Sequence, residues 1–245
     1  MKLLPRAVVV VPTYNERENV RPLIERISAV RRSVGEVDIE VLFVDDSSPD
    51  GTGQEVREAM GQYNFVHLLT RPKKEGIGRA FLEGFKFAVE RFDPTVVVQM
   101  DGDLQHPPEI IPELIHSVLE GADVAIASRK VEGGKTVGWS RRRILVSWGA
   151  NWLARIVLGL EQKDVTSGFK AYSRGTVEEL TSRKLSSSSF SYQEETLLVA
   201  KRAGKKVVEI PFTFSARKAG RTKFKTADIV RFLKAILAMG YKAAE

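Results

Sequence analysis

The sequence contains no cysteine and only three histidines among its 245 residues. The absence of cysteine excludes a disulfide framework, a thiolate metal site and a cysteine nucleophile. It is compatible with a reducing cytosol, although it does not require one. The three histidines, His67, His106 and His116, show no triad-like arrangement along the chain, so we expect His106 to be structural or to support a neighbouring residue.

The chain also lacks a long apolar run. The longest stretch, Ile144–Leu160, is interrupted by Asn151 and Arg155, and it falls short of the roughly 20 apolar residues that span a bilayer. The apolar part of the N-terminus is too short for a secretory signal. We therefore expect no transmembrane helix in this chain.

Two common nucleotide-binding motifs are missing as well. No Gly-x-Gly-x-x-Gly follows the first apolar run and no Walker lysine motif is present, which argues against a Rossmann dinucleotide site and a P-loop. The formal net charge is nevertheless +7. This balance favours anionic partners, among them nucleic acid, nucleotides, phospholipid surfaces and phosphorylated substrates, without choosing among them.

The first half of the chain alternates apolar runs with helical patterns. The expected strands are 7–14, 39–46, 65–69, 95–101 and 123–128, and the expected helices between them cover 18–34, a segment beginning near 50, 77–91 and 107–120. Runs that are apolar on consecutive residues are typical of strands buried on both faces. The alternation predicts an α/β fold, with a mostly parallel sheet and helices on both faces.

Polar clusters follow these expected strands. "PTYNE" follows the first, "DDSSPDGT" the second, "DGD" the fourth, and Arg129 the fifth. In open parallel sheets the ligand crevice lies beyond the carboxyl ends of the strands. The clusters therefore predict a binding site along that edge. Beyond Lys130 the pattern changes to a glycine-rich loop, a basic run at 141–143 and longer helices, with no internal repeat and no linker, so we expect one domain.

Asp101 and Asp103 are the clearest chemical feature. Residues two apart on an extended chain point the same way, and two converging carboxylates repel unless a cation or protons lie between them. With Gln105 they offer hard oxygen ligands that suit Mg²⁺ or Mn²⁺. Two solvated turn aspartates before a helix that begins at Pro107 explain the spacing about equally well.

The other polar stretches have simpler explanations. Asp46 could accept from the ring N–H and amino groups of a nucleobase, but "DDSSPDGT" alone is better explained as a turn with Asp50 at a helix start. The basic, glycine-rich stretch 71–80 could wrap a phosphate, and a solvated loop is the favoured interpretation.

Taken together, these stretches resemble the GT-A type inverting glycosyltransferases of family 2, and within it the enzymes that mannosylate dolichyl and other polyprenyl phosphates. The resemblance covers essentially the whole chain from Val8. Its carriers are "VVVPTYNERENV", "VDDSSPDGT", "GIGRAFLEGF", "MDGDLQHPPE", "ASRK", "GGKTVGWSRRRILVSWGAN", "DVTSGFKAYSR", "SYQEETL" and "EIPFTFSARKAGRTKF". Two positions depart from the usual pattern, because "DGD" replaces "DAD" and "DDSS" replaces "DDGS".

The resemblance implies a GT-A fold over residues 1–245, with a nucleotide-sugar half at 1–128 and an acceptor half with amphipathic helices at 129–245. It implies that Pro12, Tyr14 and Glu16 line the nucleotide pocket, with Val44 and Asp46 on the guanine side. Asp101, Gly102 and Asp103 form the DxD element, and Asp101, Asp103 and Gln105 are the metal candidates. Arg129 faces the phosphates, Arg143 and Ser147 receive the acceptor phosphate, Glu195 belongs to the sugar side, and Arg217 and Lys223 close over the diphosphate. Asp103, Arg129 and Arg143 are the expected catalytic residues.

The implied reaction transfers mannose from GDP-mannose to a polyprenyl phosphate with inversion, giving the β-linked lipid and GDP for glycan assembly or protein glycosylation. Transfer of glucose from UDP-glucose is the alternative. Nucleic-acid binding is the less favoured second alternative, since the basic stretches flank a carboxylate site that would repel a phosphate backbone.

Membrane contact follows from the residues themselves. Trp148 and Trp152 are four apart, beside a basic run, which suits a helix lying on an anionic membrane surface; internal packing of that helix is the other explanation. We expect a peripheral protein at the cytoplasmic face, whose C-terminal helix could share this task or bind a small membrane protein.

Overall fold

The computed structural model of the protein describes residues 4–183, 185, 191–216 and 226–244, the last helix in main chain alone at 226–229 and 242–244. Seven strands form one sheet in the order β3-β2-β1-β4-β7-β5-β8. Six of them run parallel, while β7 is antiparallel to both its neighbours β4 and β5. The strands are β1 (Arg6–Thr13), β2 (Asp38–Asp45), β3 (Val66–Thr70), β4 (Val96–Gln99), β5 (Val124–Ser128), β7 (Lys170–Ser173) and β8 (Val207–Pro211).

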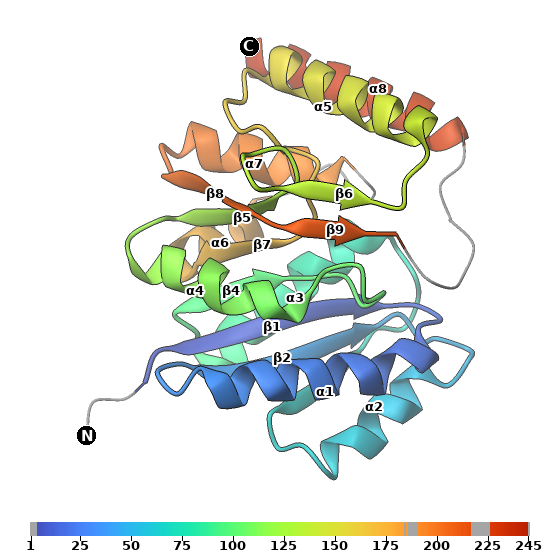
Figure 1. The fold of residues 1–245 in the computed structure, drawn as a ribbon, viewed down its shortest axis with the longest axis vertical. Coiled ribbons are helices and arrows are strands. Elements are labelled where there is room, and N and C mark those ends of the chain that lie inside the picture. The colour runs from blue at the N-terminus through green and yellow to red at the C-terminus, as the bar shows by residue number, and fades with distance from the viewer. Residues whose placement is uncertain (1–3, 184, 186–190, 217–225, 245) are drawn as a thin grey trace.

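Helices cover both faces of this sheet (Figure 1). One face carries α1 (Arg17–Ser33), α2 (Thr52–Met60) and α4 (Ile111–Leu119), the last preceded by a 3-10 turn at Pro108–Ile110. The other face carries α3 (Ile77–Phe92), α6 (Arg174–Ser182) and α7 (Tyr192–Arg202). The buried side chains of β1 alternate between the two cores, with Val9 in one and Val8 in the other. This two-sided burial is the reason why the strands are apolar on consecutive residues.

The remaining elements lie at the β8 end of the sheet. A second, two-stranded parallel sheet pairs β6 (Lys135–Val137) with β9 (Thr213–Ser215). Beyond it, α5 (Arg141–Leu158) and α8 (Thr226–Ala244) lie side by side (Figure 1). Their approach is close, because a Cβ built on Gly240 of α8 would lie 2.5 Å from Cγ1 of Val157 in α5.

The prediction of a mostly parallel α/β sheet with helices on both faces is confirmed. The five expected strands appear within two residues of their predicted bounds, as do the helices at 18–34 and 77–91. The antiparallel β7 and the helix α6 that follows it were not predicted. No helix in the described part of the chain has the length and apolarity needed to cross a membrane, as expected.

Candidate active site

Three loops meet at the edge where the parallel strands end, and each contains a non-glycine residue in the left-handed conformation. These are Asn15 after β1, Ser47 after β2 and Leu104 after β4, with φ of 57°, 53° and 63°. Positive φ is uncommon outside glycine, and such residues cluster at functional sites. Ser47 stands where the resembling family commonly has glycine. Its hydroxyl donates to the carbonyl of Arg71 at 2.6 Å, so this departure keeps the turn and adds a bond.

Two buried or half-buried aspartates join the first two of these loops. Asp45 accepts from the hydroxyls of Thr13 at 3.2 Å and Ser48 at 2.5 Å, and the Ser48 hydroxyl in turn accepts from the backbone N–H of Asn15. Asp50 accepts from the backbone N–H groups of Arg17 and Thr52, at 3.2 and 3.0 Å. The loops after β1 and β2 are therefore fixed to one another.

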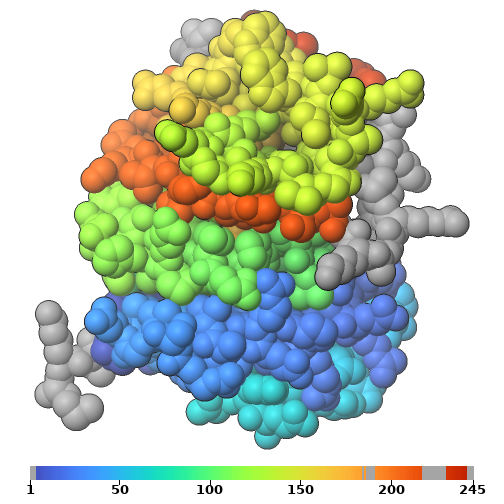
Figure 2. Space-filling model, viewed as in Figure 1, coloured from blue at the N-terminus to red at the C-terminus, as the bar shows by residue number. Residues whose placement is uncertain are grey.

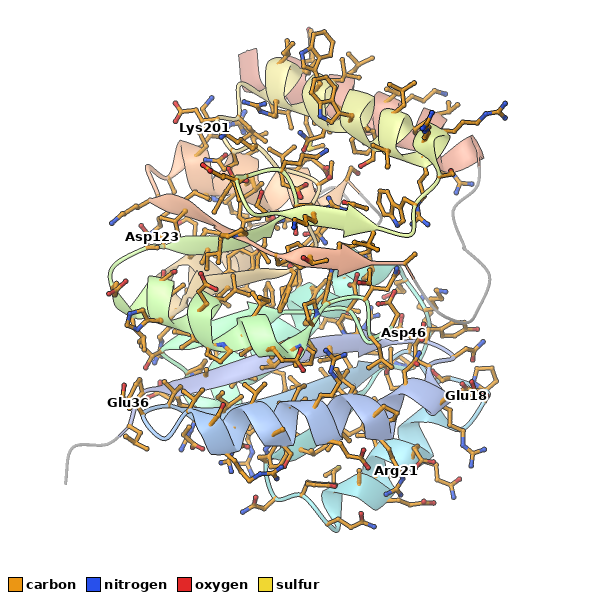
Figure 3. The ribbon with its side chains drawn as sticks, in the orientation of Figure 1. Glu18, Arg21, Glu36, Asp46, Asp123 and Lys201 are labelled. Atoms are coloured by element: carbon orange, nitrogen blue, oxygen red, sulfur yellow. The ribbon has the colours of Figure 1, made fainter. Side chains whose placement is uncertain are left out.

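Asp46 lies beside Asp45, but its partner is a buried arginine. Arg71, at the end of β3, is 2% exposed and forms ion pairs with Asp46 and with both oxygens of Glu83 on α3. Burial raises the pKa of Asp46, although the hydrogen bond and charge of Arg71 oppose the shift. The interpretation of 71–80 as a solvated loop is thus wrong at Arg71, because its guanidinium is buried in ion pairs with the carboxylates of Asp46 and Glu83. Figure 3 shows Asp46 at the edge toward which β1 and β2 run.

The structure places the other nucleotide-side candidates at the same edge, in different roles. Pro12 lies opposite Val44 of β2, two residues beyond Val10, where the pairing of β1 with β4 ends. Proline has no backbone N–H to donate, and this is tolerated where a strand has a neighbour on one side only. Tyr14 lies half-buried under the ammonium of Lys74, 4.0 Å from its ring centroid. Glu16 is the last residue before α1, and its carboxylate accepts from the side-chain amide of Asn19 at 2.7 Å. The side chain of Val44 is fully buried toward α3, so only its main chain is available to a ligand at this edge.

The DxD element follows β4. Gly102 is packed tightly on β1, since a Cβ there would lie 3.2 Å from both Thr13 and Val11, which explains the need for a small residue. Asp103 accepts from the backbone N–H of Gln105 at 3.0 Å, and the amide nitrogen of Gln105 donates to the carbonyl of Ser215 at 3.1 Å. The first bond closes the DxD loop on itself, and the second attaches the loop to β9.

His106 supports this loop. Its Nδ1 accepts from the backbone N–H of Asp101 at 3.0 Å, and its ring stacks on Phe169 with centroids 5.0 Å apart. Burial lowers the pKa of His106 to about 4, although the charge of Asp103 opposes the shift. The neutral ring therefore carries its proton on Nε2, which lies 3.9 Å from an oxygen of Asp101. His106 thus supports a DxD residue, as expected.

The residues of the DxD loop fit a divalent cation that shares its coordination with a substrate. Asp101 and Asp103 are half-buried at the open edge, and Gln105 adds an amide oxygen. No group of three or more His, Cys, Asp or Glu in the described residues could hold a metal alone. Hard oxygen donors in this small number suit Mg²⁺ or Mn²⁺ bound together with phosphate oxygens.

Arg129 and Arg143 flank one aromatic ring. Arg129, after β5, donates to both oxygens of Asp164 at 2.7 Å, and the ring of Trp139 lies 5.9 Å from its guanidinium carbon. The guanidinium of Arg143, in the first turn of α5, lies 3.9 Å from the centroid of the same ring. Ser147 follows Arg143 one turn later on the same helix face. Trp139 thus links the arginine expected at the donor phosphates to the one expected at the acceptor.

Asp164 and Trp139 were not identified from the sequence. Burial alone would raise the pKa of Asp164, but the hydrogen bonds and charge of Arg129 outweigh it and hold this pKa below its usual value. Asp164 stands in "DVTSGFK" and Trp139 in "GWSRRR", two stretches that carry the resemblance, and that membership was the available signal. Glu195 lies buried in the first turn of α7. Arg217 and Lys223 lie outside the described residues.

Comparison with known proteins identifies this arrangement. The sequence model of glycosyl transferase family 2 matches residues 8–181, which is more than half of the chain. The chain belongs to this family. An undecaprenyl-phosphate mannosyltransferase of Micrococcus luteus is 39% identical over 219 residues, covering 89% of this chain and 87% of the relative. A polyprenol monophosphomannose synthase of Mycolicibacterium smegmatis is 40% identical over 225 residues, 91% of this chain and 83% of the relative.

The fold of this family 2 member is shared with solved glycosyltransferases. Glucosyl-3-phosphoglycerate synthase from Mycobacterium tuberculosis, in complex with Mn²⁺, UDP-glucose and phosphoglyceric acid, superposes with a TM-score of 0.67. The superposition covers 96% of this chain and 79% of the synthase chain, and the two sequences are 22% identical. The protein is therefore a glycosyltransferase of the GT-A fold, and the sequence prediction of family, fold and enzyme class is confirmed.

Proposed function

We propose that this glycosyltransferase transfers mannose from GDP-mannose to dolichyl or another polyprenyl phosphate, with inversion at the anomeric carbon. The observation that carries the proposal is the identity of about two residues in five with two enzymes named for mannosyl transfer to polyprenyl phosphates. The site geometry agrees, since the carboxylate pair and Arg129 follow the ends of the parallel strands β4 and β5, and the ring of Trp139 lies against both Arg129 and Arg143. Transfer of glucose from UDP-glucose is less favoured, because the UDP-glucose-bound structure is only 22% identical.

In the proposed site, residues 1–128 hold the nucleotide and residues 129–245 the acceptor. Tyr14, Glu16 and Asp46 lie on the nucleotide side. Asp101, Asp103 and Gln105 would hold Mg²⁺ or Mn²⁺, which when bound neutralises charge on the diphosphate. Arg217 and Lys223 would close over that diphosphate.

Arg129 and Arg143 address the central difficulty of the reaction, which is to bring two anionic phosphates to one carbon. A guanidinium matches phosphate oxygens with two parallel N–H donors. Trp139 packs against Arg143, and Asp164 fixes Arg129 through both of its oxygens. Two oriented cations are therefore available near the same Trp139 ring, one proposed for each phosphate.

The chemical step needs no general base. The second pKa of a phosphate is about 6, so the acceptor oxygen is already anionic near neutral pH. That oxygen attacks the anomeric carbon and forms the new C–O bond, while the bond from this carbon to the diphosphate breaks and its electron pair leaves with GDP. Attack opposite the leaving group inverts the centre. His106 is unsuited to be a base, since its Nδ1 is occupied by the backbone N–H of Asp101.

Calorimetric titration with GDP and UDP, each with and without Mn²⁺, tests the donor. We expect metal-dependent binding of GDP in preference to UDP. Asp103→Ala should abolish this binding and the transfer while circular dichroism shows a folded protein, and Glu36→Ala, at the opposite edge of the sheet (Figure 3), should leave both unchanged. A preference for UDP would assign the alternative reaction, and no binding of either nucleotide would refute both.

The helix pair α5–α8 suits contact with the membrane that holds the acceptor. Large apolar side chains are exposed on both helices: Ile144, Leu145, Val146, Trp148, Trp152 and Ile156 on α5, and Val230, Leu233, Leu237 and Tyr241 on α8. In Figure 2, α5 occupies the end of the molecule farthest from α1 and α2. Trp148 and Trp152 share one exposed face, as predicted, at 62% and 54% exposure.

We propose that this apolar face enters the headgroup region of a membrane, with Arg141 and Arg142 near anionic lipids. The protein is then peripheral, at the cytoplasmic face, with no nucleic-acid partner. Replacement of Trp148 and Trp152 by serine should lower binding to vesicles containing anionic lipid, measured by sedimentation. Serine at Met60 and Leu119, which are exposed apolar residues on α2 and α4, is the matched control. Equal binding of the two variants would refute this orientation.

A further inference from the structure

A buried polar network lies directly beneath the DxD loop. Gln193, in the first turn of α7, accepts at Oε1 from the amide nitrogen of Gln99 at 2.7 Å and from the ammonium of Lys170 at 2.8 Å. Gln99 and Lys170 are fully buried, and Gln193 is 9% exposed. None of these three residues has a role in the reaction proposed above.

The network fixes which way the Gln193 amide points. Gln99 donates its amide nitrogen to Gln193 and, at 2.8 Å, to the carbonyl of Gly168. Its own oxygen accepts from the hydroxyl of Tyr172 at 3.3 Å. Lys170 is also a donor to Gln193 in either protonation state. Two donors at Oε1 leave Nε2 of Gln193 as the atom that faces away from the network.

Nε2 of Gln193 faces a small space that a glycine leaves open. A Cβ built on Gly168 would lie 3.3 Å from Nε2 of Gln193, 3.5 Å from Cε1 of His106 and 3.6 Å from Oδ2 of Asp101. Gly168 is only half-buried and the side chain of Asp101 is 34% exposed, so groups on two sides of this position reach solvent. Its φ is not positive, so backbone conformation does not require glycine, and the missing side chain is what distinguishes this position.

The chemistry of the space selects its occupant. An amide N–H on one side can only donate, and a carboxylate on the other accepts. A hydroxyl group satisfies both, because it accepts one hydrogen bond and donates another. A phosphate oxygen also accepts from the amide, but it carries charge of the same sign as Asp101.

We propose that Gln193, Asp101 and Gly168 form a subsite for one hydroxyl of the transferred hexose, in which Gln193 binds the hydroxyl and Lys170 and Gln99 position the Gln193 amide. The proposal rests on the proposed function, since it needs a hexose attached to a nucleotide at this edge. It adds residues that recognise the sugar independently of the nucleotide.

The test compares binding of GDP-mannose with binding of GDP by titration calorimetry. Gly168→Ala places a methyl group in the space and removes no hydrogen bond of the network. It should weaken GDP-mannose about tenfold, the equivalent of one hydrogen bond, and leave GDP unchanged. Gly175→Ala on α6, where a Cβ meets nothing within 4 Å, is the matched control.

A second variant removes the amide itself. Gln193→Met keeps the length of the side chain and should produce the same split between GDP-mannose and GDP. We also expect a difference among analogues of GDP-mannose that each lack one hexose hydroxyl. One of them should bind the wild type about tenfold more weakly than GDP-mannose does. The same analogue should bind Gly168→Ala as tightly as GDP-mannose binds that variant.

Three outcomes would overturn the subsite: equal loss of GDP and GDP-mannose in Gly168→Ala, no loss of either, or no analogue that removes the effect of the methyl group. Failure of the donor assignment is distinguishable. If the wild type binds UDP and UDP-glucose instead, the same split between these two ligands supports the subsite, and its absence refutes it. If the wild type binds neither pair, both proposals fall.

Discussion

Gly84 gives a test of how the sheet edge is held in place. It lies within α3, and a Cβ built on it would lie 2.6 Å from Cγ1 of Val10 and 2.8 Å from Cγ2 of Val44. Both valines are fully buried, one on β1 and one on β2. Because neither side chain has space to move into, Gly84→Ala must shift α3 away from the two strands whose ends carry the nucleotide side of the site.

The magnitude follows from two opposing contributions. Alanine in place of glycine within a helix stabilises by about 1 kcal/mol, whereas overpacking a buried contact costs about 1–3 kcal/mol. Two contacts below 3 Å to β-branched side chains place Gly84→Ala near the upper figure. The net expectation is a loss of about 2 kcal/mol, which lowers the melting temperature by roughly 4–8 °C in a chain of this size.

Gly149→Ala is the matched control. Gly149 lies in the middle of α5, is exposed, and has no atom within 4 Å of a built Cβ. Only the helix-propensity contribution remains there, so we expect a gain of up to about 1 kcal/mol. The propensity contribution is common to both variants, and the difference between them, about 3 kcal/mol, measures the packing cost alone.

Guanidinium unfolding followed by circular dichroism measures both values, with equal slopes as the sign that the same surface is exposed on unfolding. Stabilisation of Gly84→Ala to the extent seen in Gly149→Ala would refute the close approach of α3 to β1 and β2. Intermediate destabilisation with unchanged GDP affinity would show that the helix moves without disturbing the loops.

Three further substitutions test the site. Arg143→Ala should raise the KM for polyprenyl phosphate at least tenfold with little change for GDP-mannose, while Arg142→Ala has a smaller effect; a change confined to the donor would refute the acceptor role. Asp46→Asn should weaken GDP by a few fold, as measured by titration, because it weakens the ion pair with Arg71, and unchanged GDP affinity would remove Asp46 from the nucleotide side. Asp164→Asn should cost about 3 kcal/mol or more in unfolding experiments at neutral pH, as for a broken buried ion pair. Since the folded pKa of Asp164 is lowered, the wild type should lose this advantage as pH falls below about 4, and an advantage that persists at low pH would contradict the ion pair.

Much of the sheet could be predicted because its strands are buried on both faces. A run such as "AVVVV" in β1 has few alternatives to a central parallel strand. β7 could not be recognised in the same way. It is four residues long, and Lys170 at its start is buried through hydrogen bonds to Gln193 in a helix more than twenty residues later. The sequence around Lys170 gives no local sign of that partner.

The position of the site was more predictable than the roles of its residues. Polar residues after apolar strands marked the correct edge, because parallel strands end together. Which of two adjacent aspartates would hold the loops together was not evident, and the structure assigns this to Asp45 and the pairing with Arg71 to Asp46. Arg71 stands in a basic stretch, and its burial is explained by ion pairs with Asp46 and Glu83, which are 25 and 12 residues away along the chain.

The antiparallel β7 has a consequence for the order in which the protein can be assembled during synthesis. Strands β1 to β4 form one continuous block of the sheet, in the order β3-β2-β1-β4, so this part of the sheet can form while the chain is still emerging. β5 is different, because it pairs with β7 and β8 and is not paired with β4. It must wait until the chain through Ser173 has left the ribosome. The DxD loop after β4 and Arg129 after β5 are therefore brought to a common edge only when β7 enters between them, so the appearance of nucleotide binding should coincide with one of the last pairing events of the sheet.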